Sequence, residues 1–294
     1  MADISISCHD NYCVGHFSAM ASLCEILVEG QDKQLTEELT QLAYSEVKRI
    51  EQKFSRYRKD NICFQINNSQ GKSVHLDEET RHLLAFAEQC YQLSDGLFDL
   101  TSGVLRRIWH FDGSANIPTK QQIEQTLKKV GWHNIALHAE TMTMPKGMEI
   151  DFGGIGKEYA VDKVSELLKQ QTDKSVLVNL GGDMRVTKPM TNNTPWRVGV
   201  DDPSQNEHPI YVVQIHQGAI ATSGDANRFL LKDGIRYSHI LNPKTGQAIT
   251  EAPRSVTVAA STCIEAGLLS TLALLQGADA KDFLQAQEVD FWLK

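Results

Sequence analysis

The sequence predicts an α+β fold in a single compact domain over residues 1–294, with mixed or antiparallel sheets and peripheral helices. Helical patterns are concentrated in the first half of the chain, and strand-like runs lie mostly in the second half, before a last helix. No repeat, low-complexity tract or linker divides the chain. With 294 residues, of which 41% are hydrophobic and 22% charged, it can bury a large core.

Five segments have the apolar spacing of amphipathic helices, and they cover residues 34–54, 77–93, 118–130, 157–171 and 262–275. Asp77 is the predicted N-cap of the second helix, because acidic residues stabilise the first turn. Gly131 is the predicted stop of the third helix, because glycine readily adopts the conformation that ends a helix.

Short runs of β-branched and other apolar residues predict strands at residues 176–180, 196–200, 211–215 and 255–260. Between the first two, residues 188–195 are rich in proline and asparagine and are expected to form an exposed loop.

The net charge of −8 argues against nucleic-acid backbones or an anionic membrane surface as the main partner. No apolar run is long enough to predict a membrane span, and the N-terminus lacks the pattern of an export signal. A cytoplasmic location is therefore expected, with the periplasm as the alternative if a signal was removed. The six cysteines are scattered without a CxxC pair, which favours free thiols over disulfides.

Residues 151–162 combine glycines, an acid and a lysine directly before a helical pattern. Glycine allows close approach of the backbone to a ligand, and the N–H groups that open a helix suit an anion. The segment is not a Walker loop, because Glu158 follows Lys157 where that loop needs Ser or Thr. It predicts a phosphate site, although a plain strand-to-helix turn is an alternative interpretation.

Other small or polar segments stand at the ends of predicted elements, at residues 96–103, 179–183, 221–225 and 237–246. Residues 54–58 mix aromatic and cationic side chains, which suits either ring stacking with phosphate contact or a solvated helix end. His239 by itself is as compatible with a structural histidine as with a catalytic one. These residues alone predict an anionic, phosphorylated ligand.

Taken in order, the segments resemble the FAD:protein FMN transferase (ApbE) family, whose members attach FMN from FAD to a threonine of a target flavoprotein and release AMP. The resemblance covers residues 20–277 and is carried by Ser55–Arg58, Phe98–Thr101, Asp151–Asp162, Leu180–Asp183, Thr222–Asp225, His239–Gly246 and Ser255–Val258. It implies FAD as substrate, Mg²⁺ as cofactor and an acceptor flavoprotein as partner. It leaves the oligomeric state open.

The resemblance also implies residue roles. The FAD-binding positions would be Met20, Tyr57, Leu97, Phe98, Asp99, Asp151, Lys157 and Ile240. The metal positions would be the Gly154 carbonyl, position 267 and Thr271. Lys157 would neutralise charge on the breaking diphosphate, and His239 is the candidate general base.

The chain departs from the family pattern at two positions. The family usually shows Ala-Asp-x-x-x-Thr near the C-terminus, whereas Gly267 stands here in place of the aspartate. Glu158 follows Lys157 where glycine is commoner. A lost carboxylate should weaken the metal site, so Gly267→Asp is expected to tighten the dependence on magnesium. Hydrolysis of FAD to FMN and AMP, or FAD binding without catalysis, are the alternatives to FMN transfer.

Overall fold

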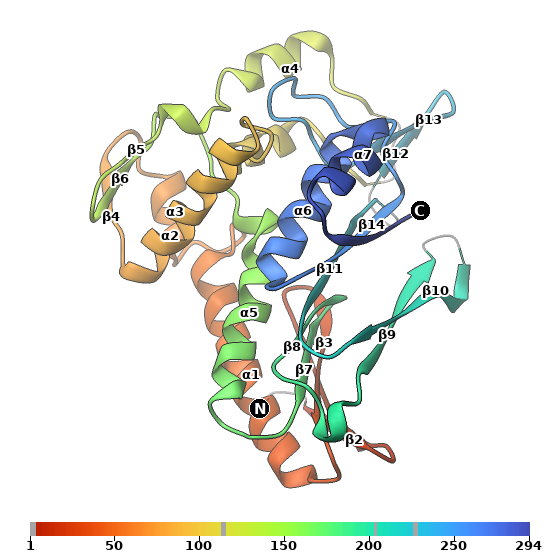
Figure 1. Ribbon diagram of the computed structural model, residues 1–294. Coiled ribbons are helices and arrows are strands. Elements are labelled where there is room, and N and C mark those ends of the chain that lie inside the picture. The colour runs from red at the N-terminus through yellow and green to blue at the C-terminus, as the bar shows by residue number, and fades with distance from the viewer. Residues whose placement is uncertain (1–3, 113–115, 203–204, 226–228) are drawn as a thin grey trace.

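The computed structural model describes residues 4–112, 116–202, 205–225 and 229–294 (Figure 1). Its central feature is an eight-stranded sheet in the order β1-β2-β3-β7-β8-β11-β14-β15, in which every neighbouring pair is antiparallel. The strands are β1 (Ser5–Cys8), β2 (Tyr12–Ala19), β3 (Ser22–Glu29), β7 (Val176–Leu180), β8 (Asp183–Val186), β11 (Gly218–Gly224), β14 (Ser255–Ala260) and β15 (Asp290–Leu293).

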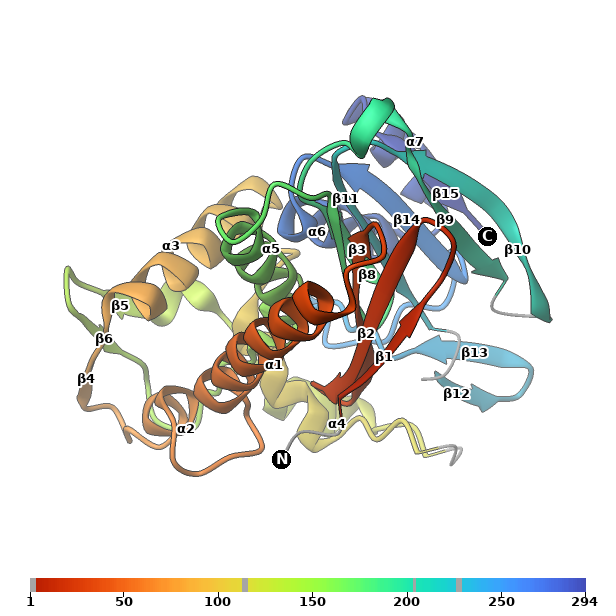
Figure 2. The ribbon, with the colours of Figure 1, turned by 90° about the horizontal axis from the view of Figure 1, so that it is seen from below.

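One face of the sheet is covered by three helices, α1 (Lys33–Phe54), α5 (Gly156–Lys169) and α6 (Cys263–Leu275), as Figures 1 and 2 show. Helix α1 contacts β2 and β3, α5 contacts β7 and β8, and α6 contacts β11 and β14. Because side chains alternate along a strand, Val176 and Val178 point into the core under these helices, whereas Leu177 points to the opposite face. The main hydrophobic core therefore lies between the sheet and the three helices.

The opposite face is covered in part by a long hairpin of β9 (Trp196–Asp202) and β10 (Gln205–Ile215). Trp196 and Ile215 pack there against Leu177 and Ile220 of the main sheet. The central strands are thus buried on both faces, which explains why they are apolar runs rather than clean alternations.

Smaller elements surround this core. The remaining α-helices are α2 (Ile62–Asn67), α3 (Glu78–Leu93), α4 (Lys120–Leu127) and α7 (Ala280–Ala286). The 3₁₀ turns are η1 (Leu100–Arg107), η2 (Trp132–Asn134), η3 (Phe152–Gly154), η4 (Thr191–Asn193) and η5 (Gly277–Asp279). A three-stranded sheet contains β4 (Ser73–His75), β6 (Thr141–Thr143) and β5 (Ala136–Leu137), and a separate hairpin contains β12 (Phe229–Lys232) and β13 (Ile235–Ser238).

The predicted α+β class is confirmed, and Asp77 caps α3 as expected by accepting a hydrogen bond from the Thr80 amide. Helix α4 ends earlier than predicted, at Leu127, because the chain tightens there into i→i−3 hydrogen bonds before Gly131. The expected order of helices first and strands later was wrong at the N-terminus, where β1, β2 and β3 open the sheet.

Both β1 and β15 belong to the central sheet, although they lie at opposite ends of the sequence. This arrangement is compatible with one domain over residues 1–294, which stays a prediction. Among the described residues, no helix combines the length and the apolar character that crossing a membrane requires.

The expectation of free thiols was wrong for Cys8 and Cys13. These residues are paired across the β1–β2 hairpin and joined by a disulfide, whereas Cys24, Cys63, Cys90 and Cys263 are free and buried. Pairing of the two strands brings the cysteines face to face, which sequence spacing alone does not reveal.

Candidate active site

The central feature of the site is an ion pair at the N-terminus of α5. Lys157 Nζ lies 2.7 Å from Asp183 Oδ2, and the Lys157 side chain is 31% exposed while that of Asp183 is 3% exposed. Burial would lower the pKa of Lys157, but the charge and hydrogen bond of Asp183 outweigh it and raise that pKa above its ordinary value. The Lys157 side chain is thus partly exposed, and its ammonium is held in place by the buried carboxylate of Asp183.

Strand β11 links this ion pair to helix α6. The amide of Thr222 donates to Asp183 Oδ1 over 3.2 Å, and the next residue, Ser223, has its hydroxyl 3.0 Å from Thr271 Oγ1 and 2.8 Å from Ser270 Oγ. The Thr222–Asp225 and Leu180–Asp183 segments, which the sequence marks separately, therefore meet at Lys157 and Thr271.

Helices α5 and α6 are held in a defined register by Asp162. Its carboxylate accepts hydrogen bonds of 2.9 Å from both the Cys263 and Ile264 amides at the start of α6. One turn earlier on α5, Glu158 packs against Gly267, one turn further along α6. The turn η3, which contains Gly154 and ends before α5 begins, also contacts α6.

Glu158 is a buried carboxylate in this register, with 9% of its surface exposed. Burial and the nearby charge of Asp183 raise its pKa from 4.5 to about 8. No described residue donates a hydrogen bond to its Oε2. The sequence marked Glu158 only as a departure from a pattern, and only the register shows that it faces Gly267.

A second group of side chains surrounds Asp151. Its Oδ2 lies 2.9 Å from Arg56 and 3.7 Å from Arg106, and its Oδ1 accepts from the Gly153 amide. Gly103 packs so closely that a Cβ there would lie 2.6 Å from the Cβ of Asp151, which explains glycine at that position. The three segments at residues 55–58, 96–103 and 151–154 therefore converge.

Phe98 belongs to the same region. Its ring lies 3.5 Å from where a Cβ on Gly154 would stand, so the predicted ring-lining and metal positions are neighbours. Asp99 is mainly structural in its contacts, because its carboxylate accepts from the Thr101 amide and hydroxyl and from the Trp132 amide. A contact of Asp99 with FAD remains a prediction, as does that of Leu97.

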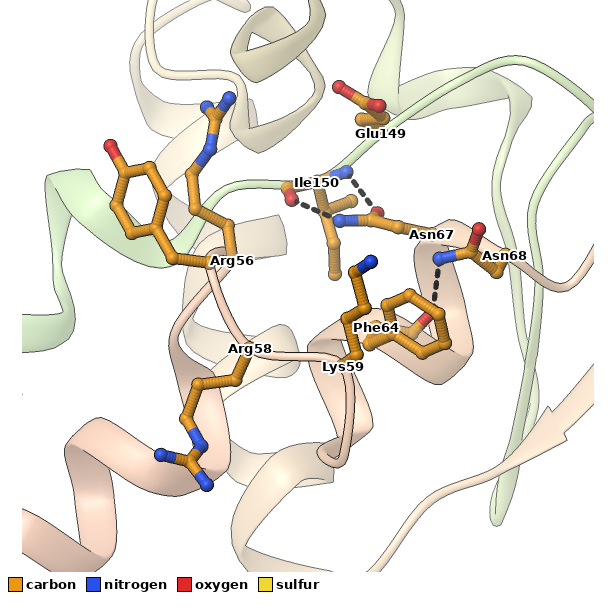
Figure 3. Close-up of a pocket in the computed structure, with 9 residues that line it drawn as sticks. Arg56, Arg58, Lys59, Phe64, Asn67, Asn68, Glu149 and Ile150 are labelled. Atoms are coloured by element: carbon orange, nitrogen blue, oxygen red, sulfur yellow. Dashed lines mark hydrogen bonds between the residues drawn. The ribbon is translucent and has the colours of Figure 1, made fainter.

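A surface cavity of about 220 Å³ opens beside this group. Arg56, Arg58 and Lys59 line it from the loop after α1, with Asn67 and Glu149 on the other side (Figure 3). Asn67 is fixed by two hydrogen bonds to the backbone of Ile150, at 2.8 and 3.0 Å. Arg56 pairs with Asp151 and Arg58 with Asp60, so an anionic ligand at this cationic lining would compete with these carboxylates.

Two predicted ring-binding residues lie at the edges of the site. Tyr57 is 81% exposed, which leaves its ring accessible for stacking, and the Arg56 guanidinium lies over the ring at 5.5 Å from its centroid. Met20 lies in the β2–β3 turn, where its amide donates to Glu51. That turn approaches Lys157 through Gly181, which packs against Ser22 and lies close to the lysine ammonium.

His239 and Ile240 follow β13. The His239 ring is half-buried and edge-on to Phe111, with centroids 6.3 Å apart, and Ile240 packs on the main core. The same loop is tied to the helical region by Gly246, whose carbonyl accepts from Trp109 Nε1. The ring contact with Phe111 and the hydrogen bond from Trp109 hold the loop that contains His239 in place. The role of His239 as general base remains a prediction.

The oxygen atoms of Glu158, which lies against Gly267, and of Thr271, one turn further along α6, are of the kind that binds a divalent cation. No cluster of three or more His, Cys, Asp or Glu side chains within the described ranges is arranged to hold a metal. The available ligands are instead one carboxylate, a hydroxyl and a carbonyl, from Glu158, Thr271 and Gly154. Hard oxygen ligands of this kind suit Mg²⁺, which commonly takes its other ligands from phosphates and water.

The fold and this phosphate-type site define a nucleotide-binding α+β protein. Residues 20–293 match the ApbE family, and the chain therefore belongs to that family. The match extends beyond the 20–277 range carried by the sequence motifs.

Relatives and solved structures agree with this assignment. The chain is 28% identical to a FAD:protein FMN transferase of Vibrio cholerae over 78% of its length and 71% of that protein, and 27% identical to one of Escherichia coli over 91% and 80%. It superposes on an ApbE protein of Thermotoga maritima with a TM-score of 0.87 and 30% identity, covering 96% and 94% of the two chains. A flavinyl transferase ApbE of Pseudomonas stutzeri shares the fold, with a TM-score of 0.82 and 24% identity over 98% and 92%.

Proposed function

We propose that this protein is a FAD:protein FMN transferase, which moves FMN from FAD onto a threonine hydroxyl of an acceptor flavoprotein with the assistance of Mg²⁺. The names of its ApbE relatives support the reaction. The observation that carries the proposal is the partly exposed Lys157 side chain, whose ammonium is held by the buried Asp183 beside the residues that link to Thr271.

In the proposed reaction the threonine oxygen attacks the phosphorus on the FMN side of the diphosphate. The new Oγ–P bond forms as the bridging P–O bond breaks, and AMP leaves with the bridging oxygen. The hydroxyl proton passes to a general base, for which His239 is the candidate. Lys157 stabilises the charge that develops on the diphosphate, because its ammonium stays protonated beside Asp183.

Binding of FAD would use both convergent groups of residues. Arg56 and the cationic loop after α1 attract the phosphates, and Tyr57 and Phe98 offer aromatic faces to the rings. When bound, Mg²⁺ would neutralise diphosphate charge, with Thr271 and the Gly154 carbonyl among its ligands.

Incubation with FAD, Mg²⁺ and a threonine-containing acceptor flavoprotein tests the proposal. We expect covalently flavinylated acceptor by mass spectrometry together with one equivalent of AMP, and none when the acceptor threonine is replaced by alanine. Free FMN and AMP without acceptor labelling would identify water as the acceptor instead. Unchanged FAD would refute a catalytic role.

A further inference from the structure

Glu158 and Gly267 are the two positions at which the chain departs from its family pattern, and they touch each other. A Cβ on Gly267 would lie 2.6 Å from Glu158 Cγ and 2.9 Å from its Oε1. A glutamate at 158 in this position therefore leaves no room for a side chain at 267. The two departures form one coupled exchange, in which a carboxylate from α5 fills the space next to α6.

The carboxylate of Glu158 is held in a place where the protein does not satisfy it. The residue is buried, with 9% of its surface exposed, and within the described part of the chain its Oε2 has no hydrogen-bond partner. The nearest lysine, Lys157, is engaged by Asp183. Buried carboxylate oxygens without partners are costly, so this one points to a ligand that would satisfy it.

Other candidate oxygen ligands lie on α6 and on the turn η3, the two elements that pack near this carboxylate. Asp162 pairs with the start of α6, Glu158 contacts Gly267, and the turn η3 that contains Gly154 also contacts α6. Gly267 and Thr271 are four residues apart and share one face of α6. Glu158 therefore packs against α6 one turn before Thr271, on a helix that the turn containing Gly154 also contacts.

We propose that Glu158 supplies, from α5, the metal-binding carboxylate that Gly267 does not provide from α6. The inference rests on the proposed function, because the FAD diphosphate would complete the coordination of Mg²⁺. It also changes the expectation for Gly267→Asp. That substitution alone places a Cβ against Glu158 and a second carboxylate in the same space, so it should weaken the metal site rather than tighten it.

The test is a calorimetric titration of Mg²⁺ into the FAD-saturated protein without acceptor, over a period in which no AMP is released. Glu158→Gln keeps the size of the side chain and removes the carboxyl group that would ionise on binding the metal, and we expect at least ~10-fold weaker Mg²⁺ binding with FAD affinity in EDTA unchanged. The exposed Glu265 lies on α6 close to Gly267, and Glu265→Gln is the matched control, expected to bind Mg²⁺ as the wild type does.

The decisive variant exchanges the two positions. Glu158→Ala combined with Gly267→Asp moves the carboxylate from α5 to α6 and should restore Mg²⁺ affinity to within about threefold of wild type. Each single substitution should remain at least ~10-fold weaker. Thermal unfolding of every variant, measured without metal, confirms that the compared proteins are folded.

Equal Mg²⁺ affinity of Glu158→Gln and wild type would overturn the inference, as would tighter binding by Gly267→Asp alone. Either result would leave the proposed function standing if the wild type still flavinylates its acceptor. If the wild type binds FAD but does not flavinylate its acceptor, that result would contradict the proposed function instead.

Discussion

Replacing Lys157 by methionine should destabilise the protein as well as inactivate it, because it leaves the Asp183 carboxylate buried without its partner. At the observed separation of 2.7 Å, two unit charges attract by about 6 kcal/mol at an effective dielectric constant of ~20. The cost of desolvating both groups opposes most of this attraction. Loss of one partner of a buried pair typically costs 3–5 kcal/mol, and the 31% exposure of Lys157 favours the lower end, about 3 kcal/mol.

Urea unfolding at pH 7, followed by tryptophan fluorescence and by circular dichroism, measures this cost. The double variant Lys157→Met with Asp183→Asn should recover about 2 kcal/mol relative to the single lysine variant, because the amide removes the buried charge and can still accept from Thr222. Lys163→Met, an exposed change on the same helix, should alter stability by less than ~0.5 kcal/mol. A single variant within ~1 kcal/mol of wild type, or a double variant less stable than the single, would refute the reasoning.

Three further predictions concern other parts of the molecule. The hydrogen bonds of Arg49 hold the pKa of Glu79 at about 2, below its ordinary 4.5, so this stabilisation is present above pH 4.5 and is lost as the pH falls toward 2. Glu79→Gln should therefore lower the unfolding free energy at pH 7 by roughly 1–2 kcal/mol and make it depend less on pH between 4.5 and 2. The same loss of unfolding free energy with falling pH in wild type and variant would contradict this assignment. Tyr57→Ala should weaken FAD binding, measured by calorimetry, about tenfold without changing stability, whereas Tyr57→Phe should retain binding. Equal losses of FAD affinity in the two variants would exclude stacking. His239→Ala should slow transfer by about 100-fold with FAD affinity unchanged, and wild-type turnover would assign His239 to the scaffold.

Several parts of the fold could be predicted from local sequence because local interactions determine them. The N-cap at Asp77 and the helical spacing of residues 34–54 depend on neighbours within a few positions, and the structure confirms both. Strands β7 and β14 match their predicted ranges for the same reason. Strand β3 was not predicted, because Leu23 and Leu27 place apolar residues on the face opposite Ile26 and obscure the alternation of apolar and polar residues that indicates a strand.

The sequence by itself determined the family motifs, the chemical class of the ligand and the two departures at Glu158 and Gly267. It could not show that these departures touch, because 109 positions separate residues 158 and 267 and their contact depends on the α5–α6 register set by Asp162. The Cys8–Cys13 bridge likewise depends on strand pairing. Only the tertiary structure decided these points, because contacts between distant elements follow from packing and register, which leave no signal at fixed spacing along the chain.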